Sequence, residues 1–316
     1  MGRLKIVYPV CCGMDVHRDF LIACIAATNA QGVTEYQSRR FSTYTGSLRE
    51  LRDWLLANDC KDVCMESTGK YWFPVHNILE ESCHVVVSHP KFVKAIKGKK
   101  TDKKDAQWIA DLFKHDLVRG SFIPPKDIRQ LRDLCRYWVK LSSYMTGEKN
   151  RAQNCLTVSN FKLDDVFSNV FGKSASAITT QLLEHPGEQF DVAPFVDGRC
   201  KTPIAQIQEA VDGIFTYEQA EKLKIIRGHM DSLERHKAEL ESLILEIAQN
   251  YLPQIELLLT VPGIHDAFTA IRILAEIGAD MTVFDTSKHL CSWAGLTPQN
   301  AESAGKKKTT RIGKSG

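Results

Sequence analysis

The chain has 316 residues, of which 43% are hydrophobic and 25% charged, as in a globular protein of about two domains. Its net charge of +3 is too small to indicate a partner, and the sequence has no run of about 20 apolar residues that would cross a membrane. Ten scattered cysteines follow an N-terminus without a secretory signal. We therefore expect a cytoplasmic protein with buried, reduced thiols and neither disulfides nor a zinc site.

The first 125 residues predict an α/β domain. Apolar, β-branched runs with short links predict three strands that pair as antiparallel hairpins, and two later apolar runs predict buried strands separated by helices. The predicted strands are residues 7–14, 20–27, 33–41, 62–66 and 84–88, and the predicted helices are 46–58, 71–82 and 102–117. The order βββαβαβα is that of a ribonuclease H-like (RuvC-like) fold, in which the first and fourth strands are neighbours.

The middle of the chain predicts a helical linker and coiled coil over residues 126–252. Pro124 and Pro125 interrupt the chain, and one long helix is predicted from 126 to about 158. Residues 159–216 give little signal. Apolar residues then recur at alternating spacings of three and four over residues 217–251, which predicts a heptad helix that packs on a partner helix. That partner is either the 126–158 helix or a second subunit.

The last segment, residues 253–316, predicts a mainly helical domain. Residues 257–278 read as two helices around a tight turn at Pro262–Gly263. This is either a helix-hairpin-helix, whose turn amides contact DNA phosphates, or a plain helical hairpin, and spacing does not decide between them. A short helix is predicted at 286–294, followed by a loop-like, glycine-rich tail. Since domains rarely end in such a tail, we expect the chain to be truncated.

Four acidic residues form a candidate metal site. Asp15 follows the first strand, Glu66 ends the fourth, and Asp102 and Asp105 share one helix face at a spacing of three. Ligands bind beyond strand ends in such sheets, and carboxylates that converge there need a compensating cation. The donor set suits Mg²⁺ or Mn²⁺, and two such ions can act on a phosphoryl group.

Each acid also has a purely structural interpretation. Asp15 could be a turn residue, and Asp102 could be a helix N-cap, with Thr101 as its rival for that position. Asp105 could be a first-turn acid that suits the helix dipole. A carboxylate at the end of a buried strand, as at Glu66, is harder to explain structurally. The four acids together favour the metal site.

Two basic clusters are candidate nucleic-acid contacts, although such runs are often only solvated surface. They comprise Lys97, Lys99, Lys100, Lys103 and Lys104, and Lys306, Lys307, Lys308 and Arg311.

The segments GMDVHRD, CMESTGKYW and HPKFVKAIKGKKTDKKDAQWIADLF resemble the N-terminal DEDD domain of a family of bacterial insertion-sequence transposases. This family includes bridge-RNA-guided recombinases and is similar to Piv-type invertases. The segments LLLTVPGIHDAFTAIRILAEIG and FDTSKHLCSWAGLTPQNAESAGKKKTTRIGKSG resemble its C-terminal transposase domain. The resemblance implies a transposase or site-specific recombinase whose DEDD acids are Asp15, Glu66, Asp102 and Asp105.

The resemblance also implies a serine nucleophile, which in this sequence is Ser303. It would attack a DNA phosphate and hold the strand as a phosphoserine ester, with activation by a base or a metal ion. Further implied are donor and target double-stranded DNA, a structured guide RNA, and a dimer or tetramer associated through the 217–251 helix. In such an assembly the acids of one subunit meet the serine of another.

The sequence departs from the family pattern in two places. Ser303 is followed by Ala304 and Gly305 where Ser-Gly is common, and Gly313 stands where a serine is common. Ser303 could therefore be an ordinary loop serine. The alternative functions are a metal-dependent nuclease or junction resolvase that uses the acids alone, and an inactive, truncated relic that still binds DNA. An actin-like ATPase or sugar kinase would need a glycine-rich phosphate loop beside Asp15, where the sequence has none.

Overall fold

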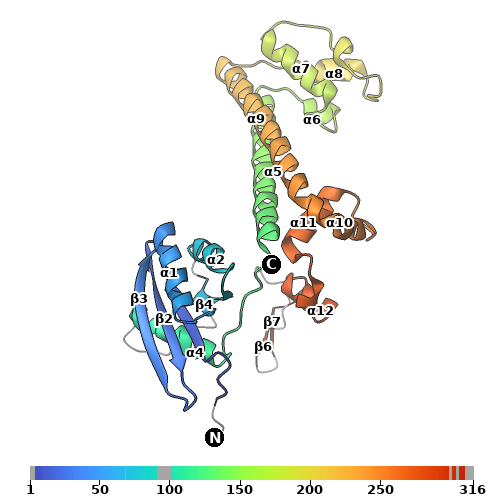
Figure 1. Ribbon diagram of the computed structural model, residues 1–316. Helices are drawn as coiled ribbons and strands as arrows, with labels where there is room; N and C mark the ends of the chain where they lie inside the picture. The colour runs from blue at the N-terminus through green and yellow to red at the C-terminus, as the bar shows by residue number, and fades with distance from the viewer. Residues whose placement is uncertain (1–3, 68, 91–100, 299–300, 304–305, 310–316) are drawn as a thin grey trace. The chain divides into compact units, whose positions relative to one another are not determined.

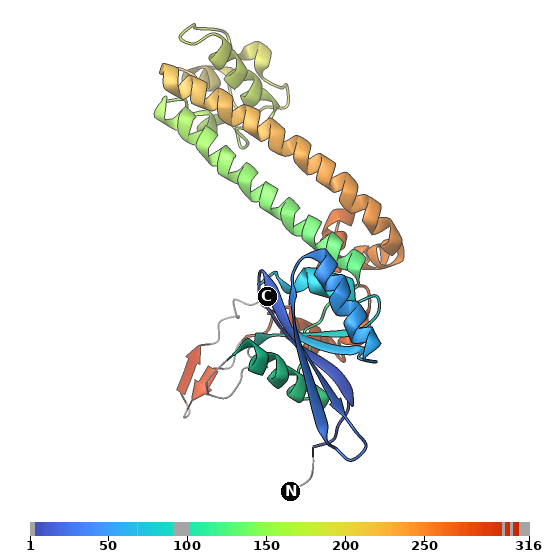
Figure 2. The same ribbon diagram turned by 60° about the vertical axis from the view of Figure 1, so that its left-hand side comes forward.

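The computed structural model describes residues 4–67, 69–90, 101–298, 301–303 and 306–309 (Figures 1 and 2). The chain forms two compact units, Met1–Ile123 and Pro124–Gly316. Within the described ranges, no helix combines the length and apolar character needed to cross a membrane. All ten cysteines lie in these ranges as free thiols, and seven of them are buried.

The first unit is built on a five-stranded sheet in the order β3-β2-β1-β4-β5. Its strands are β1 (Val10–Val16), β2 (Phe20–Thr28), β3 (Thr34–Ser42), β4 (Asp62–Glu66) and β5 (His84–Ser88). β1 pairs antiparallel with β2 and parallel with β4, and β4 pairs parallel with β5. The predicted order of elements along the chain, βββαβαβα, and the predicted neighbourhood of the first and fourth strands are confirmed.

Three helices cover the two faces of this sheet. On one face, α1 (Thr45–Ala57) and α2 (Trp72–Leu79) bury leucine and aromatic side chains against alternate residues of the strands, such as Cys12 and Met14. On the other, α4 (Asp102–Lys114) packs Ile109, Ala110 and Phe113 on Cys11 and Cys64. Because side chains alternate along a strand, odd-numbered residues of β1 face α4.

Gly13 sets how closely α4 approaches the sheet. A Cβ atom at this position would lie 2.3 Å from both the Ala106 carbonyl oxygen and the Ala110 backbone nitrogen. These are helix backbone atoms, which cannot rotate away as a side chain can. A glycine inside a strand therefore permits direct contact between the backbones of β1 and α4.

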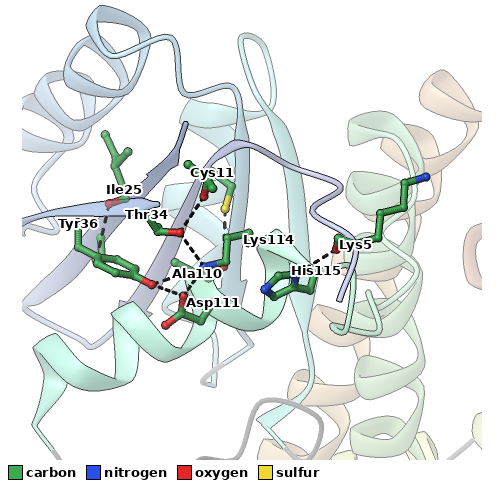
Figure 3. A network of polar contacts seen from close by, with 11 residues as sticks. Lys5, Cys11, Ile25, Thr34, Tyr36, Ala110, Asp111, Lys114 and His115 are labelled. Atoms are coloured by element: carbon green, nitrogen blue, oxygen red, sulfur yellow. Dashed lines mark hydrogen bonds and ion pairs between the residues drawn. The ribbon is translucent and has the colours of Figure 1, made fainter. Parts of the chain in front are cut away.

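A buried lysine fastens the C-terminal end of α4 to the edge of the sheet (Figure 3). The Lys114 ammonium donates to Asp111 Oδ1 at 2.9 Å, Thr34 Oγ1 at 3.2 Å and Tyr36 Oη at 3.5 Å. Burial alone would lower the pKa of Lys114, but its hydrogen bond and ion pair with Asp111 raise it overall. The Tyr36 hydroxyl also donates to Asp111, at 2.5 Å. β3 and α4 are thereby linked through one cation.

Lys114→Met should destabilise the first unit by about 2–3 kcal/mol, because it leaves the half-buried Asp111 carboxylate without its cation. The reduction should appear as a lower midpoint of chemical denaturation. The double variant Lys114→Met/Asp111→Asn should recover most of the loss. Equal stability of the wild-type protein and the single variant would show that the network does not fasten α4.

The second unit is organised around two long helices, α5 (Lys126–Val158) and α9 (Tyr217–Ala248), which lie side by side in both views (Figures 1 and 2). Leu233, Leu240 and Ile244 of the predicted heptad pack into one core with residues of α5 such as Leu131 and Leu141. The helix over residues 217–248 is confirmed, and α5 of the same chain occupies its apolar stripe. Any contact of α9 with a second copy must use the rest of its surface.

Residues 159–216, which gave little sequence signal, form a small helical subregion with its own core. It contains α6 (Leu163–Val166), α7 (Lys173–Glu184) and α8 (Ile204–Ala210), with a 3-10 turn at Ala193–Phe195. Its core includes Phe161, Ile178 and Ile207, which pack with the adjoining ends of α5 and α9. Short helices separated by Gly, Pro and Asp have no extended periodicity, so sequence patterns do not reveal them.

The predicted helical pair is α10 (Leu252–Leu259) and α11 (Ala267–Ile277), with Gly263 between them at a φ of +97°. Arg132 of α5 holds the end of α11 by donating to the carbonyl oxygens of Ala275 and Glu276, both at 2.9 Å. The short helix α12 (Ser287–Trp293) follows.

The loop-like tail was predicted wrongly. Residues Ala301–Ser303 (β6) and Lys306–Thr309 (β7) form a two-stranded antiparallel ribbon. The polar, lysine-rich sequence lacks the apolar alternation by which strands are recognised from sequence.

Candidate functional site

Asp15 and Glu66 lie next to each other at the carboxyl ends of two parallel strands. Met14 of β1 is in register with Met65 of β4, so the residue that follows each of them is a carboxylate. Both acids are on the α4 face, because each stands two residues after a position that packs against this helix, Gly13 or Cys64. The sheet register thus sets this half of the site.

The first turn of α4 provides the other two acids. The N-cap of the helix is Thr101, whose hydroxyl accepts the Lys104 backbone N–H at 3.3 Å. Asp102 is therefore not the N-cap, and that structural interpretation of Asp102 is wrong. Asp102 and Asp105 both lie within the first turn, which helix polarity favours for carboxylates.

Asp15 and Asp102 converge, and His17 lies between them. His17 Nε2 is 3.2 Å from Asp15 Oδ2 and 3.8 Å from Asp102 Oδ1. One ligand atom from each of these three residues lies within 4.8 Å of the others. The Asp15 side chain is only 14% exposed, whereas that of Asp102 is 51% exposed. Asp15 is therefore largely buried in the sheet, whereas Asp102 is exposed to solvent.

Burial and neighbouring charge raise the pKa of the Asp15 carboxyl. Burial is the largest cause, the nearby Asp102 and Asp105 carboxylates add to it, and His17 acts in the opposite direction. Ionisation of Asp15 is thus less favourable in the metal-free protein than in a solvated aspartate. A bound cation would reverse this, and two carboxylates with an imidazole are a donor set that fits a divalent ion.

The remaining predicted site residues fall in three groups. Lys103 and Lys104 are exposed on the first turn of α4, beside the acids. Lys97, Lys99, Lys100 and Arg311 lie outside the described residues. Ser303 ends β6 in register with Lys306 of β7, on which Lys307 and Lys308 also lie. The four acids therefore belong to the first compact unit and Ser303 to the second.

Two residues that matter for this geometry, Gly13 and His17, were not singled out in the sequence. Gly13 could have been recognised as a glycine inside a strand, which often marks a close backbone approach. His17 could have been recognised by its spacing of two from Asp15, which places both on one face of an extended chain.

The order of strands in the sheet is that of a ribonuclease H-like domain. The acids on its first and fourth strands and on the helix that covers them form a candidate cation site. Residues 12–160 match the family model of the DEDD transposases of IS110, described as "Transposase", and residues 255–316 match the model described as "Transposase IS116/IS110/IS902 family". The chain belongs to the IS110 family of transposases, enzymes that cut and transfer DNA. A search of curated proteins found no match.

Solved structures that this chain is similar to include Thermus thermophilus RuvC and a Fowlpox virus resolvase. Thermus thermophilus RuvC is 14% identical with a TM-score of 0.30, and covers 35% of this chain and 99% of its own. RuvC in complex with a Holliday junction substrate is 13% identical, with a TM-score of 0.27 and coverages of 35% and 99%. The Fowlpox virus resolvase in complex with Holliday junction DNA is 14% identical, with a TM-score of 0.23 and coverages of 33% and 72%.

Proposed function

We propose that this transposase is the site-specific recombinase of an insertion sequence, which cuts and rejoins DNA with metal-bound acids and a serine nucleophile. The observation that supports it most directly is the convergence of Asp15 and Asp102 at the end of β1, where Glu66 is the neighbouring strand-end acid. Family membership supplies the class of reaction.

In this proposal Asp15, Glu66, Asp102 and Asp105 hold one or two divalent ions, Mg²⁺ or Mn²⁺. Such an ion, when bound, polarises a phosphoryl oxygen and makes a hydroxyl more acidic. Asp15 and Glu66 are fixed by the sheet, whereas Asp102 and Asp105 are fixed by the position of α4. The exposed Lys103 and Lys104 then face the incoming DNA backbone, whose phosphates they attract.

Ser303 is the nucleophile in this proposal. Its Oγ attacks a DNA phosphorus, the hydroxyl proton passes to a base, and the P–O bond to the leaving deoxyribose oxygen breaks as that oxygen takes up a proton. The strand is then held as a phosphoserine ester. Attack by the hydroxyl of another strand reverses these changes and joins the new DNA, so no external energy source is required.

The partners are proposed as donor and target double-stranded DNA and a structured RNA that selects them. Lys97, Lys99, Lys100, Lys306, Lys307, Lys308 and Arg311 are proposed contacts to these nucleic acids. We further propose that residues 1–125 carry the acids, that 126–252 form a helical spacer supporting a dimer or tetramer, and that 253–316 form the serine domain with a hairpin at Pro262–Gly263. The proposed location is the cytoplasm.

Ser303→Ala should abolish a covalent protein–DNA adduct. Wild-type protein incubated with the element's end DNA, its flanking transcript and Mg²⁺ should leave radiolabelled DNA attached to protein after denaturation, whereas the variant should leave none. An adduct that persists in the variant would rule out Ser303. Nicked DNA without any adduct, in wild type and variant alike, would indicate a nuclease that uses the acids alone. Retained DNA binding without cleavage would indicate an inactive relic.

Mixing two inactive variants tests whether one subunit's acids act with another subunit's serine. Asp15→Asn and Ser303→Ala are each expected to be inactive alone. In a mixed dimer with shared sites, one site regains intact acids and an intact serine, so a 1:1 mixture should form about a quarter of the wild-type adduct. If each site were built from one chain, the mixture would stay inactive.

A further inference from the structure

We propose that His17 is a direct ligand of the metal ion at the DEDD site, which gives the site a stronger preference for Mn²⁺ over Mg²⁺ than the carboxylates alone would have. This rests on the proposed function, since it assumes that the acids hold a divalent ion. It adds a nitrogen donor to a set that otherwise contains only oxygen.

The position of the imidazole nitrogen fits that of a ligand. In an octahedral site with bonds of 2.0–2.1 Å, neighbouring ligand atoms stand about 3 Å apart. His17 Nε2 stands 3.2 Å from Asp15 Oδ2, close to this separation. Its 3.8 Å to Asp102 Oδ1 is longer, but the Asp102 side chain is 51% exposed and can turn toward the same point. One nitrogen thus faces both acids.

The ring of His17 is held in place by neighbouring groups as well as by the hydrogen bond between its Nε2 and Asp15 Oδ2. Its centroid lies 4.8 Å from that of Phe20, and the Arg40 guanidinium lies over the Phe20 ring at 4.1 Å. The backbone N–H of His17 also donates to the Phe20 carbonyl at 2.9 Å. A ring supported in this way loses less freedom on binding an ion than a mobile surface histidine would.

The chemistry of an imidazole donor predicts ion selectivity. Mg²⁺ prefers oxygen ligands and retains its water, whereas first-row transition ions accept imidazole nitrogen readily. Loss of the nitrogen should therefore weaken binding of Mn²⁺ more than that of Mg²⁺. A residue that merely positions the Asp15 carboxylate would affect both ions equally.

The test uses the full chain without DNA. Mn²⁺ binding is measured by electron paramagnetic resonance, Mg²⁺ by competition, and directly bound nitrogen by ¹⁴N electron-spin-echo modulation. We expect the wild-type signal to show ¹⁴N modulation. His17→Ala should abolish it and reduce Mn²⁺ affinity on the order of 10–100-fold, with a smaller loss for Mg²⁺. His17→Gln, which keeps a donor for Asp15 but no ligand nitrogen, should behave like His17→Ala.

His84→Ala is the matched control, since His84 Nδ1 lies 2.9 Å from Asp62 Oδ1 at the opposite end of the same sheet, where β4 and β5 begin. It should bind both ions as the wild type does. The proposal is overturned if ¹⁴N modulation survives in His17→Ala, if both ions weaken equally, or if His17→Gln restores wild-type binding. Should Mn²⁺ bind in an Asp15-dependent way regardless of His17, the DEDD site stands and only His17 ligation fails. If the wild type binds neither ion, both proposals fail.

Discussion

Replacing Asp15 with asparagine is expected to abolish DNA cleavage and, at neutral pH, to stabilise the metal-free protein. Asp15 is the more buried of the two acids in the Asp15–His17–Asp102 cluster, and it lies within the paired part of β1. Removing even a supporting partner of a metal ligand costs 10–100-fold in affinity or activity, so loss of a ligand should reduce adduct formation by more than about 100-fold.

The gain in stability follows from the raised pKa of the Asp15 carboxyl. Burial is the largest cause of this shift, and Asp102 and Asp105 contribute. Above the raised pKa, Asp15 is ionised in both the folded and the unfolded state, but its negative charge costs more free energy in the folded protein. As pH rises through that value, the metal-free wild type should lose stability that Asp15→Asn retains, and the difference should vanish below the ordinary pKa of aspartate.

Both effects can be measured on one pair of proteins. Thermal unfolding in EDTA as a function of pH reports stability, and adduct formation in Mg²⁺ reports activity. Asp62→Asn is the control. Like Asp15, Asp62 lies at a strand end and contacts a histidine, but it lies at the opposite end of β4 from Glu66. If the Asp15→Asn variant retained cleavage, Asp15 would not be a residue of the active site. If the metal-free variant were less stable than the metal-free wild type, the electrostatic argument would be wrong.

Gly13→Ala is expected to displace α4 and thereby disable the site without touching an acid. Its methyl group would meet the Ala106 and Ala110 backbone at 2.3 Å, so the helix must move away from β1. Overpacking of this kind costs about 1–3 kcal/mol. A shift of about 1 Å in a reacting group can cost 100-fold in rate, and Asp102 and Asp105 move with α4.

Gly46→Ala is the matched control for this variant. Gly46 lies in the first turn of α1, and a Cβ atom there would meet nothing within 4 Å. Alanine also favours a helix over glycine, so this variant should be as stable as the wild type or more so. Mn²⁺ affinity and adduct formation should fall only in Gly13→Ala. If Gly13→Ala binds metal as the wild type does, the close packing of α4 on β1 does not determine the geometry of the site.

The sequence alone was sufficient to predict most helices and strands of the fold. Alternating and helical apolar patterns located the strands of the sheet and both long helices, because burial imposes a period on each element. It did not reveal the helices of residues 159–216, whose segments are too short to repeat a pattern, or the β6–β7 ribbon, whose sequence has no apolar alternation.

The four acids could be named from the sequence because residue type, strand ends and helical spacing are all local properties. Tertiary structure decided where they lie: the register of Met14 with Met65 puts Asp15 beside Glu66 on the neighbouring strand, and the missing side chain of Gly13 lets α4 lie directly on β1. It also placed His17 between Asp15 and Asp102. Distances between residues far apart in the chain depend on packing, and a linear pattern does not contain them.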